Sequence, residues 1–355
     1  MNGLAARSLP SMSRRSLTLS IAGLATVVAI ALLVLIPVPY VILGPGPTLN
    51  TLGKDSSGQP LITIVGPRTY PTIGHLNLVT VSYQGGPGVN LNIFQALRAW
   101  LDPSQAVVPE SELFPPGQTA QQTQQQDTEQ MSSSQETATA AALTTLHIPY
   151  QTTVVVTATV AGYPASKVLK AGDVIEAVDG KPVTGQSGLS SLITAHPVGS
   201  PLRLTVRRGG KTSQLVVKST KSGGAAVIGV QVQQQYKFPF TVKFSVGDIG
   251  GPSAGMMFAL GIIDKLTPTN LTGGKFIAGT GEITAAGQVQ PIGGIQQKMV
   301  GARDAGATVF LTPAANCADT RGAVPAGLRI VKVSTLTQAV TDLEALKAGK
   351  SVPSC

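Results

Sequence analysis

The chain has 355 residues, of which 43% are hydrophobic and only 12% are charged, with 26 lysine and arginine residues against 17 acidic ones. This apolar share is enough for a sizeable core and excludes a chain that is disordered throughout. Two cysteines and three histidines exclude a disulfide-dense scaffold and a four-cysteine zinc site, and they make a histidine-rich metal site a poor hypothesis. The length predicts two or three domains.

An apolar segment near the N-terminus predicts a membrane anchor. Residues 17–36 carry no charge, and a helix of about 20 residues spans about 30 Å, the thickness of the hydrocarbon core of a bilayer. A cleaved signal peptide is the alternative, although its apolar region normally runs to only about 7–15 residues. Arg7, Arg14 and Arg15 precede the segment. The positive-inside rule therefore predicts a single-pass protein of the cell membrane, with residues 1–16 cytoplasmic and the body extracytoplasmic.

This topology also bears on the net charge and the cysteines. Because the body would lie outside the cell, we attribute the net charge of +9 to solubility and attraction to an anionic membrane surface, and we expect no nucleic-acid partner. An oxidising compartment favours a disulfide between Cys317 and Cys355. Closing a loop of that length is worth about 4 kcal/mol in the chain-entropy model.

Residues 42–150 form an extracytoplasmic region to which the sequence assigns no chemistry. Alternating apolar and polar residues over 61–83 predict strands, and residues 94–101 predict a short helix. Residues 117–135 are rich in Gln, Ser and Thr, which is typical of a linker or a flexible loop. Residues 135–146 then predict a helix that leads out of this linker.

Residues 151–235 predict a small β-rich domain with a hairpin that turns at Gly209-Gly210. The segment AGDVIEAVDGKPV, which follows a short helix around residues 165–169, resembles bacterial-type PDZ domains, and Ile228-Gly229-Val230 is the best match for the strand that receives a peptide C-terminus. The resemblance implies that a bound peptide adds a strand to the sheet. The alternative is a domain that only spaces the anchor from the rest. Gly210-Lys211-Thr212 lacks the earlier glycine of a phosphate-binding loop, so no nucleotide is expected.

The strongest local signal is GGPSAG at residues 250–255, where the strand-like run TVKFSV passes into the apolar, helical run AGMMFALGIIDKL. Ser253 is thereby placed near a helix N-terminus, whose N–H groups favour developing negative charge, as a nucleophile requires. The pattern G-x-S-x-G also occurs in α/β-hydrolases, which carry their histidine after the serine. His75, His147 and His196 all precede Ser253. A lysine with a lowered pKa is therefore the better candidate for the base.

Lys298 lies in a pattern that suits this role. Residues 294–306 (GIQQKMVGARDAG) predict a helix, and Ile295, Lys298, Met299 and Ala302 share one of its faces. Burial among apolar groups lowers the pKa of a lysine because it disfavours the charged form. On the pattern alone, a surface lysine at the edge of the apolar stripe is an equally good interpretation.

Two motifs, P-S-A-G around Ser253 and P-I-G-G followed by Lys298, closely resemble the proteolytic domain of Lon proteases over about residues 240–345. That family works with a Ser–Lys dyad, so the resemblance implies Ser253 as nucleophile, Lys298 as general base, and Thr280 of the motif T-G-E-I beside the lysine. Two features depart from the family. No ATP-driven unfoldase precedes the domain, and Gly250 stands where Lon proteases often carry an acidic residue, the nearest being Asp248.

The combined order of anchor, PDZ-like domain and Lon-like domain resembles the YlbL-type membrane-anchored peptidases. We therefore expect an α+β fold with an N-terminal transmembrane helix (17–36), a region 42–150, a PDZ-like domain (151–235) and a Lon-type proteolytic domain (236–350). We predict an ATP-independent serine endopeptidase that acts on extracytoplasmic peptides or unfolded segments and needs no metal or cofactor. Lon-type domains form rings, so the resemblance also allows a homo-oligomer. The alternatives are an inactive PDZ scaffold on a Lon-like fold and an enzyme of the signal-peptidase type.

Overall fold

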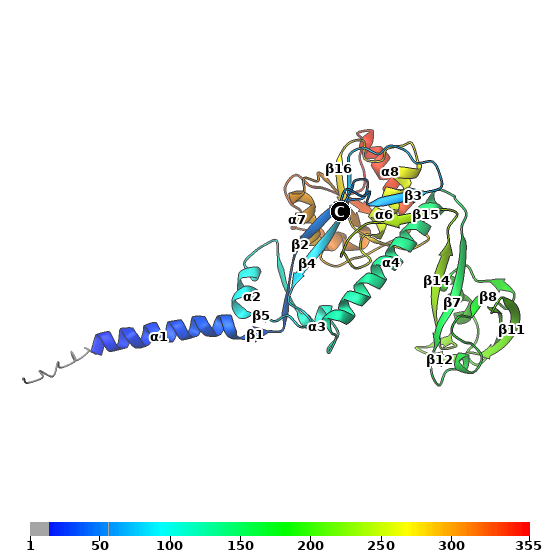
Figure 1. The fold of residues 1–355 in the computed structure, drawn as a ribbon, viewed down its shortest axis with the longest axis horizontal. Helices are drawn as coiled ribbons and strands as arrows, with labels where there is room; N and C mark the ends of the chain where they lie inside the picture. Colours follow the sequence, from blue (N-terminus) through cyan, green and yellow to red (C-terminus); the bar gives the residue numbers. More distant parts are fainter. Residues whose placement is uncertain (1–13, 56) are drawn as a thin grey trace, which may run out of the picture.

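The computed structural model describes residues 14–55 and 57–355. Arg7 and most of the segment 1–16, for which a cytoplasmic location is predicted, lie outside the described residues. Helix α1 (Arg14–Leu35) extends away from the rest of the chain (Figure 1). It is long and apolar enough to cross a membrane, by length and composition alone.

Directly after α1, the chain forms a small ladder that fixes the next helix in place. Strand β1 (Pro37–Val38) pairs antiparallel with β5 (Leu91–Asn92), and β5 leads into α2 (Ile93–Trp100). Asn92 caps α2 in a reciprocal pair of hydrogen bonds with Gln95. As a result, α2 lies beside the carboxyl end of α1 and contacts it (Figure 1).

The Lon-like part of the chain is built on a six-stranded sheet in the order β20-β19-β16-β4-β2-β6. Strands β20, β19, β16 and β4 run parallel, whereas β2 is antiparallel to β4 and β6. The strands are β2 (Tyr40–Asn50), β4 (His75–Gln84), β6 (Ala106–Pro109), β16 (Phe276–Gly279), β19 (Val309–Pro313) and β20 (Arg329–Val333).

Helices cover both faces of this sheet. Alternate strand residues point to opposite faces, so Ile277 packs with α6 (Gly255–Leu266) and α8 (Leu336–Lys347), whereas Ala278 packs with α7 (Ile295–Asp304). Two apolar cores result, one on each side of the sheet. They confirm the predicted α+β class for this part of the chain.

The prediction that residues 42–150 are a region separate from the proteolytic domain is wrong. Strands β2 and β4 lie inside the central sheet, and β4 pairs with β16 across about 200 residues of sequence. Strand β3 (Ile62–Val65) likewise pairs with β15 (Thr241–Phe244), which lies just before the serine motif. The Lon-like domain is therefore assembled from two segments of the chain.

The prediction of a flexible linker at residues 117–135 is also wrong. These residues belong mostly to α4 (Ala120–Thr145), a helix that Thr119 caps and that runs past α6 (Figure 1). One side of α4 is buried through small or flexible side chains: Thr123, Met131, Ser134, Ala138, Ala141 and Ala142. Small residues allow close packing without the large apolar residues that usually signal a buried helix face.

The PDZ-like domain is inserted between these two segments and is reached through β7 and β14 (Figure 1). Its sheet has the order β11-β10-β8-β7-β14, and the predicted hairpin turns between β10 and β11. Its elements are β7 (Gln151–Thr159), a 3₁₀ turn (Pro164–Lys167), β8 (Val174–Val178), β9 (Lys181–Pro182), α5 (Gln186–Thr194), β10 (Pro201–Arg208), β11 (Lys211–Lys218), β12 (Thr220–Ser222), β13 (Ala225–Val227) and β14 (Val230–Lys237).

The remaining elements are short and belong to the Lon-like domain: α3 (Glu110–Leu113), β17 (Glu282–Ile283), β18 (Val289–Gln290) and a 3₁₀ segment (Ala314–Thr320). The predicted disulfide between Cys317 and Cys355 is present and ties the C-terminal tail to this segment. The tail also accepts a hydrogen bond at Pro353 O from the backbone of Lys332 in β20.

Candidate active site

Ser253 lies on the loop that joins β15 to α6, directly before the helix begins. Both ends of this loop are tied to other parts of the domain. Ser245 Oγ donates a hydrogen bond to Asp55, and the Ser253 carbonyl accepts hydrogen bonds from Gly281 N–H (2.8 Å) and Thr280 Oγ1 (3.0 Å). These contacts fix the backbone on which the half-buried serine is carried.

Lys298 approaches this serine from α7, which packs on the opposite face of the sheet from α6. Its Nζ lies 3.0 Å from Ser253 Oγ and 3.3 Å from Thr280 Oγ1. The predicted helix and its buried face are confirmed, because Ile295, Met299 and Ala302 are buried in the core beside it. Gln297, which is not on the apolar face, is buried as well.

The environment of Lys298 favours a neutral amine. Its side chain is only 3% exposed, and burial lowers the pKa of Lys298 from 10.5 to about 8. A pKa near 8 leaves about a tenth of the amine neutral at pH 7, whereas an exposed lysine is almost wholly charged. A neutral amine within hydrogen-bond reach of a hydroxyl can accept its proton.

The start of α6 differs from the expectation that its first N–H groups face a substrate. Gly255 N–H donates to Pro252 O at 3.3 Å, and Met256 N–H donates to Gly281 O at 2.9 Å. These two groups hold the turn and the neighbouring strand region together. Their role is therefore to fix the position of Ser253.

A cavity of about 270 Å³ opens beside Ser253 and Lys298. Most of its walls are apolar, and they come from β2, β4, α3, α4 and the serine loop: Leu43, Val79, Val81, Leu113, Met131 and Ile249. Five of these six residues precede the PDZ-like insertion. Sequence analysis missed them because they carry no motif. The two strands among these elements, β2 and β4, take their places in the sheet through β16, which is distant in sequence.

Helix α4 also supports the serine loop directly. Ser134 Oγ donates to Pro252 O at 3.0 Å, and Gly251 N–H donates to the backbone carbonyl of Asp127 at 3.2 Å. A β-carbon at position 250 would lie 2.5 Å from Asp127 Cβ. Gly250 is therefore needed for this close approach, and Asp127 occupies the space that an acidic side chain at position 250 would require. Asp248, in contrast, is exposed.

No cluster of three or more His, Cys, Asp or Glu residues able to hold a metal ion occurs within residues 14–55 and 57–355. The three histidines are all remote from the serine in sequence, and His75 stacks on Phe276 with ring centroids 4.5 Å apart.

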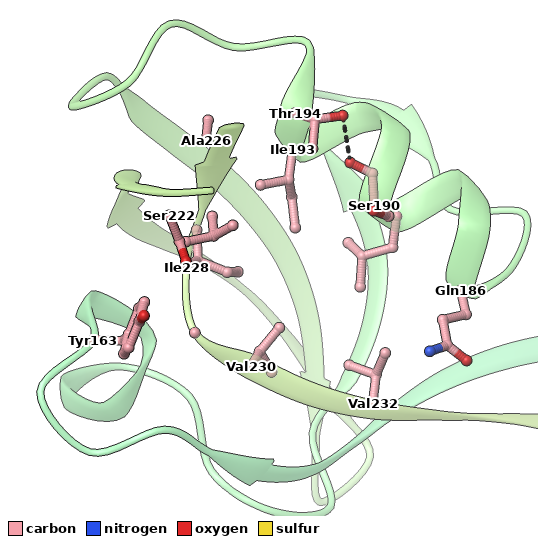
Figure 2. A pocket seen from close by; sticks show the side chains of 13 residues that line it. Tyr163, Gln186, Ser190, Ile193, Thr194, Ser222, Ala226, Ile228, Val230 and Val232 are labelled. Carbon is pink, nitrogen blue, oxygen red and sulfur yellow. Dashed lines mark hydrogen bonds between the residues drawn. The ribbon is translucent and has the colours of Figure 1, made fainter. Parts of the chain in front are cut away.

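The PDZ-like domain has a second cavity, of about 360 Å³, between α5 and β14. Figure 2 shows Ile193 of α5 opposite Val230 and Val232 of β14, with Tyr163 beside the end where β14 begins. Gly229, which precedes β14, has φ +75°, and a β-carbon there would lie 2.0 Å from Tyr163 Cβ. Because β14 is an edge strand, the groove runs along an edge that is open to a further strand.

Comparison with known families identifies both domains. Residues 228–345 match the Lon protease (S16) C-terminal proteolytic domain, and residues 123–219 match the PDZ domain. The chain thus combines a PDZ domain with the proteolytic domain of a serine peptidase family. The PDZ match ends before β14, although in the structure this strand completes the domain's sheet.

Two Lon proteases are among the proteins that this chain resembles over part of its length. A Lon protease of Roseiflexus castenholzii is 45% identical over 71 residues, which is 20% of this chain and 9% of that protein. A Lon protease of Orientia tsutsugamushi is 30% identical over 138 residues, 36% of this chain and 17% of that protein. The chain thus matches less than a fifth of the length of either protease. A solved PDZ domain of the SdrC-like protein of Listeria innocua is 26% identical, with a TM-score of 0.22, and covers 22% of this chain and 92% of that one.

Proposed function

We propose that this protein is a membrane-anchored serine endopeptidase that cleaves extracytoplasmic peptides or unfolded protein segments without ATP. The proposal rests on one observation above all: a buried lysine amine lies 3.0 Å from the hydroxyl of Ser253. Ser253 is the nucleophile, and Lys298 is the general base. No metal, nucleotide or other cofactor takes part in this reaction, and neither nucleic acid nor nucleotide is a partner.

The proposed reaction uses the lowered pKa of Lys298 at two stages. The neutral amine accepts the proton of the Ser253 hydroxyl while its oxygen attacks the scissile carbonyl. The resulting ammonium then donates that proton to the leaving amine, and a water molecule hydrolyses the acyl-enzyme by the same route. Thr280, 3.3 Å from Nζ, orients the amine between these steps.

The decisive experiment compares the full chain in detergent micelles with Ser253→Ala and Lys298→Ala, using unfolded casein without ATP. Both substitutions should reduce cleavage by at least about a thousandfold, the size typical for removal of a nucleophile or its base. Wild-type activity should rise with pH through about 8 as Lys298 loses its proton.

Lys265→Met is the matched control, because Lys265 is also a lysine whose pKa is lowered by burial. It lies at the far end of α6, about 18 Å from Ser253 along the helix at 1.5 Å per residue. This variant should keep wild-type activity. Loss of activity in Lys265→Met together with activity in Lys298→Ala would refute the assignment of the base. A serine-reactive phosphonate that labels none of the proteins would instead favour an inactive scaffold.

The PDZ domain would dock substrates through the groove between α5 and β14. A peptide with an apolar C-terminus would add to the open edge of β14, and its last side chain would contact Ile193 and Val232.

Replacing the exposed groove residue Ser190 with tryptophan should weaken binding of such a peptide at least about tenfold, because the ring fills the groove. Fluorescence anisotropy with a labelled peptide measures the change, and cleavage of a short peptide that bypasses the groove should be unaffected. Equal peptide affinity in both proteins would exclude this groove as the docking site.

The N-terminal helix would anchor the enzyme with its body outside the cytoplasm. The support is the length and apolar composition of α1, together with Arg14 and Arg15 at its start. A homo-oligomer remains compatible with this arrangement. A C-terminal tag that resists added protease in spheroplasts would contradict the proposed orientation.

A further inference from the structure

Helix α2 presents large apolar side chains to the outside of the molecule. Phe94, Leu97, Trp100 and Leu101 are 55%, 47%, 74% and 79% exposed, respectively. They are spaced at i, i+3, i+6 and i+7, so they lie within an arc of about 120° on one side of the helix. These four residues are called the α2 face below. Exposed apolar patches of this kind mark contacts with a partner or a membrane.

The opposite side of α2 explains why this face points outward. Ala99 is buried in a small core with Ile42 and Leu91, so α2 packs on the protein through its smallest side chains. The larger side chains are left outside, which is the reverse of the usual arrangement for a helix on a soluble protein. A water-facing helix would bear the polar residues on this side.

The position of α2 indicates what covers this face. The β1–β5 ladder places the start of α2 against the residues that follow α1, only two positions beyond its last residue. Helix α2 and α1 are in contact, and Figure 1 shows α2 beside the carboxyl end of α1. If α1 crosses a bilayer, α2 is held at the level where the hydrocarbon core meets the headgroups.

We propose that the α2 face lies in the outer interface of the lipid bilayer and holds the proteolytic domain against the membrane surface. This inference rests on the anchoring role proposed above for α1. Amphipathic helices that lie in this interface bury their apolar face about 5–10 Å into the boundary between headgroups and acyl chains. Tryptophan is enriched at this depth, and Arg98, beside the face, can reach lipid phosphates.

Contact of the α2 face with the bilayer would fix the orientation of the proteolytic domain relative to the membrane. The segment that follows α2 forms β6 at the edge of the central sheet and then α3, which supplies Leu113 to the cavity beside Ser253. Two membrane contacts, α1 and the α2 face, hold the domain in one orientation. Substrate segments would then be drawn from the zone close to the membrane surface.

Trp100 offers a direct test because it is the single tryptophan of the chain. The full protein is reconstituted into vesicles of phosphatidylcholine and phosphatidylglycerol, with or without bromine atoms on the acyl chains. Helix α1 contains no tryptophan, so the fluorescence reports on α2 alone. We expect brominated lipids to remove most of the Trp100 emission and aqueous iodide to remove little of it.

Two variants keep the test specific. Leu97→Glu, on the α2 face, should reverse this pattern, so that iodide quenches Trp100 and brominated lipid does not. Val216→Glu places the same charge at a similarly exposed site in the PDZ domain and should leave the pattern unchanged. Cleavage of a soluble peptide by both variants shows that they are folded.

The other outcomes separate this inference from the anchoring on which it rests. Protein that floats with the vesicles but is quenched only by iodide would leave α1 as an anchor and refute the contact of α2. Quenching by neither agent would place Trp100 against protein, as in a second copy of the chain, and would also refute it. Protein that does not float with the vesicles would refute the anchoring and the inference together.

Discussion

Replacing Lys298 with methionine is expected to abolish peptidase activity and, at the same time, to raise the free energy of unfolding by about 3 kcal/mol near pH 7. Lys298 is almost fully buried, and its pKa falls from 10.5 to about 8 for that reason. On folding, the protonated amine loses favourable hydration, and this loss lowers the free energy of unfolding. An apolar side chain has no such hydration to lose. Methionine is flexible and similar in length, so it can occupy the same space.

The expected gain depends on pH in a defined direction. Below about pH 8 the amine is protonated in both the folded and the unfolded chain, so the methionine variant exceeds the wild type in free energy of unfolding by the full amount. Between about pH 8 and 10.5 the unfolded chain binds a proton that the folded chain has lost, so the stability of the wild type rises with pH. Above about pH 10.5 the amine is neutral in both the folded and the unfolded chain, and the difference in free energy of unfolding disappears.

Urea unfolding of the two full-length proteins in the same detergent, followed by circular dichroism near pH 7 and near pH 10, measures this difference. A gain of equal size at both pH values would show that it comes from packing and not from the buried charge. A loss of stability at both would mean that the hydrogen bonds of Lys298 to Ser253 and Thr280 outweigh its desolvation. Either result would weaken the argument that burial lowers the pKa of this amine at a cost in stability.

The residues closest to the candidate chemistry could be predicted because local sequence determines them. Ser253 follows glycines that permit a tight turn before an apolar helix, and Lys298 shares a helix face with three apolar residues. Both patterns depend on neighbours within one turn or one helix. The hairpin of the PDZ domain was predictable for the same reason, since a Gly-Gly pair closes it.

The surroundings of the site could not be predicted, because they depend on contacts between distant parts of the chain. Strand β4 reads as a strand from its own residues, but nothing in them specifies β16 as its partner. Helix α4 was missed for a different reason. Its buried face consists largely of Thr, Ser and Ala, whereas Gln dominates its exposed side, so the composition resembles that of a linker.

The contact between α4 and the serine loop leads to a second large effect, at Gly250. Changing Gly250 to alanine is expected to reduce kcat about a hundredfold, since a misplacement of about 1 Å at a catalytic group has an effect of this size. The new β-carbon would lie 2.5 Å from Asp127 Cβ and 3.3 Å from its Cα, so either the loop or α4 must move. Ser253 lies only three residues further along the same loop and would move with it.

Gly250 is well suited to this test because its backbone does not require glycine, in contrast to Gly251, whose φ is +84°. An effect of Gly250→Ala therefore reports the contact with Asp127 and not backbone strain. Adding Asp127→Gly removes the opposing β-carbon and should restore most of the activity, although glycine inside α4 costs about 1 kcal/mol of stability. Steady-state kinetics of the wild type, the single variant and the double variant on one peptide give the answer. If Gly250→Ala keeps its kcat, or if the double variant is no more active than the single one, α4 does not position the serine, and its burial against the loop serves stability alone.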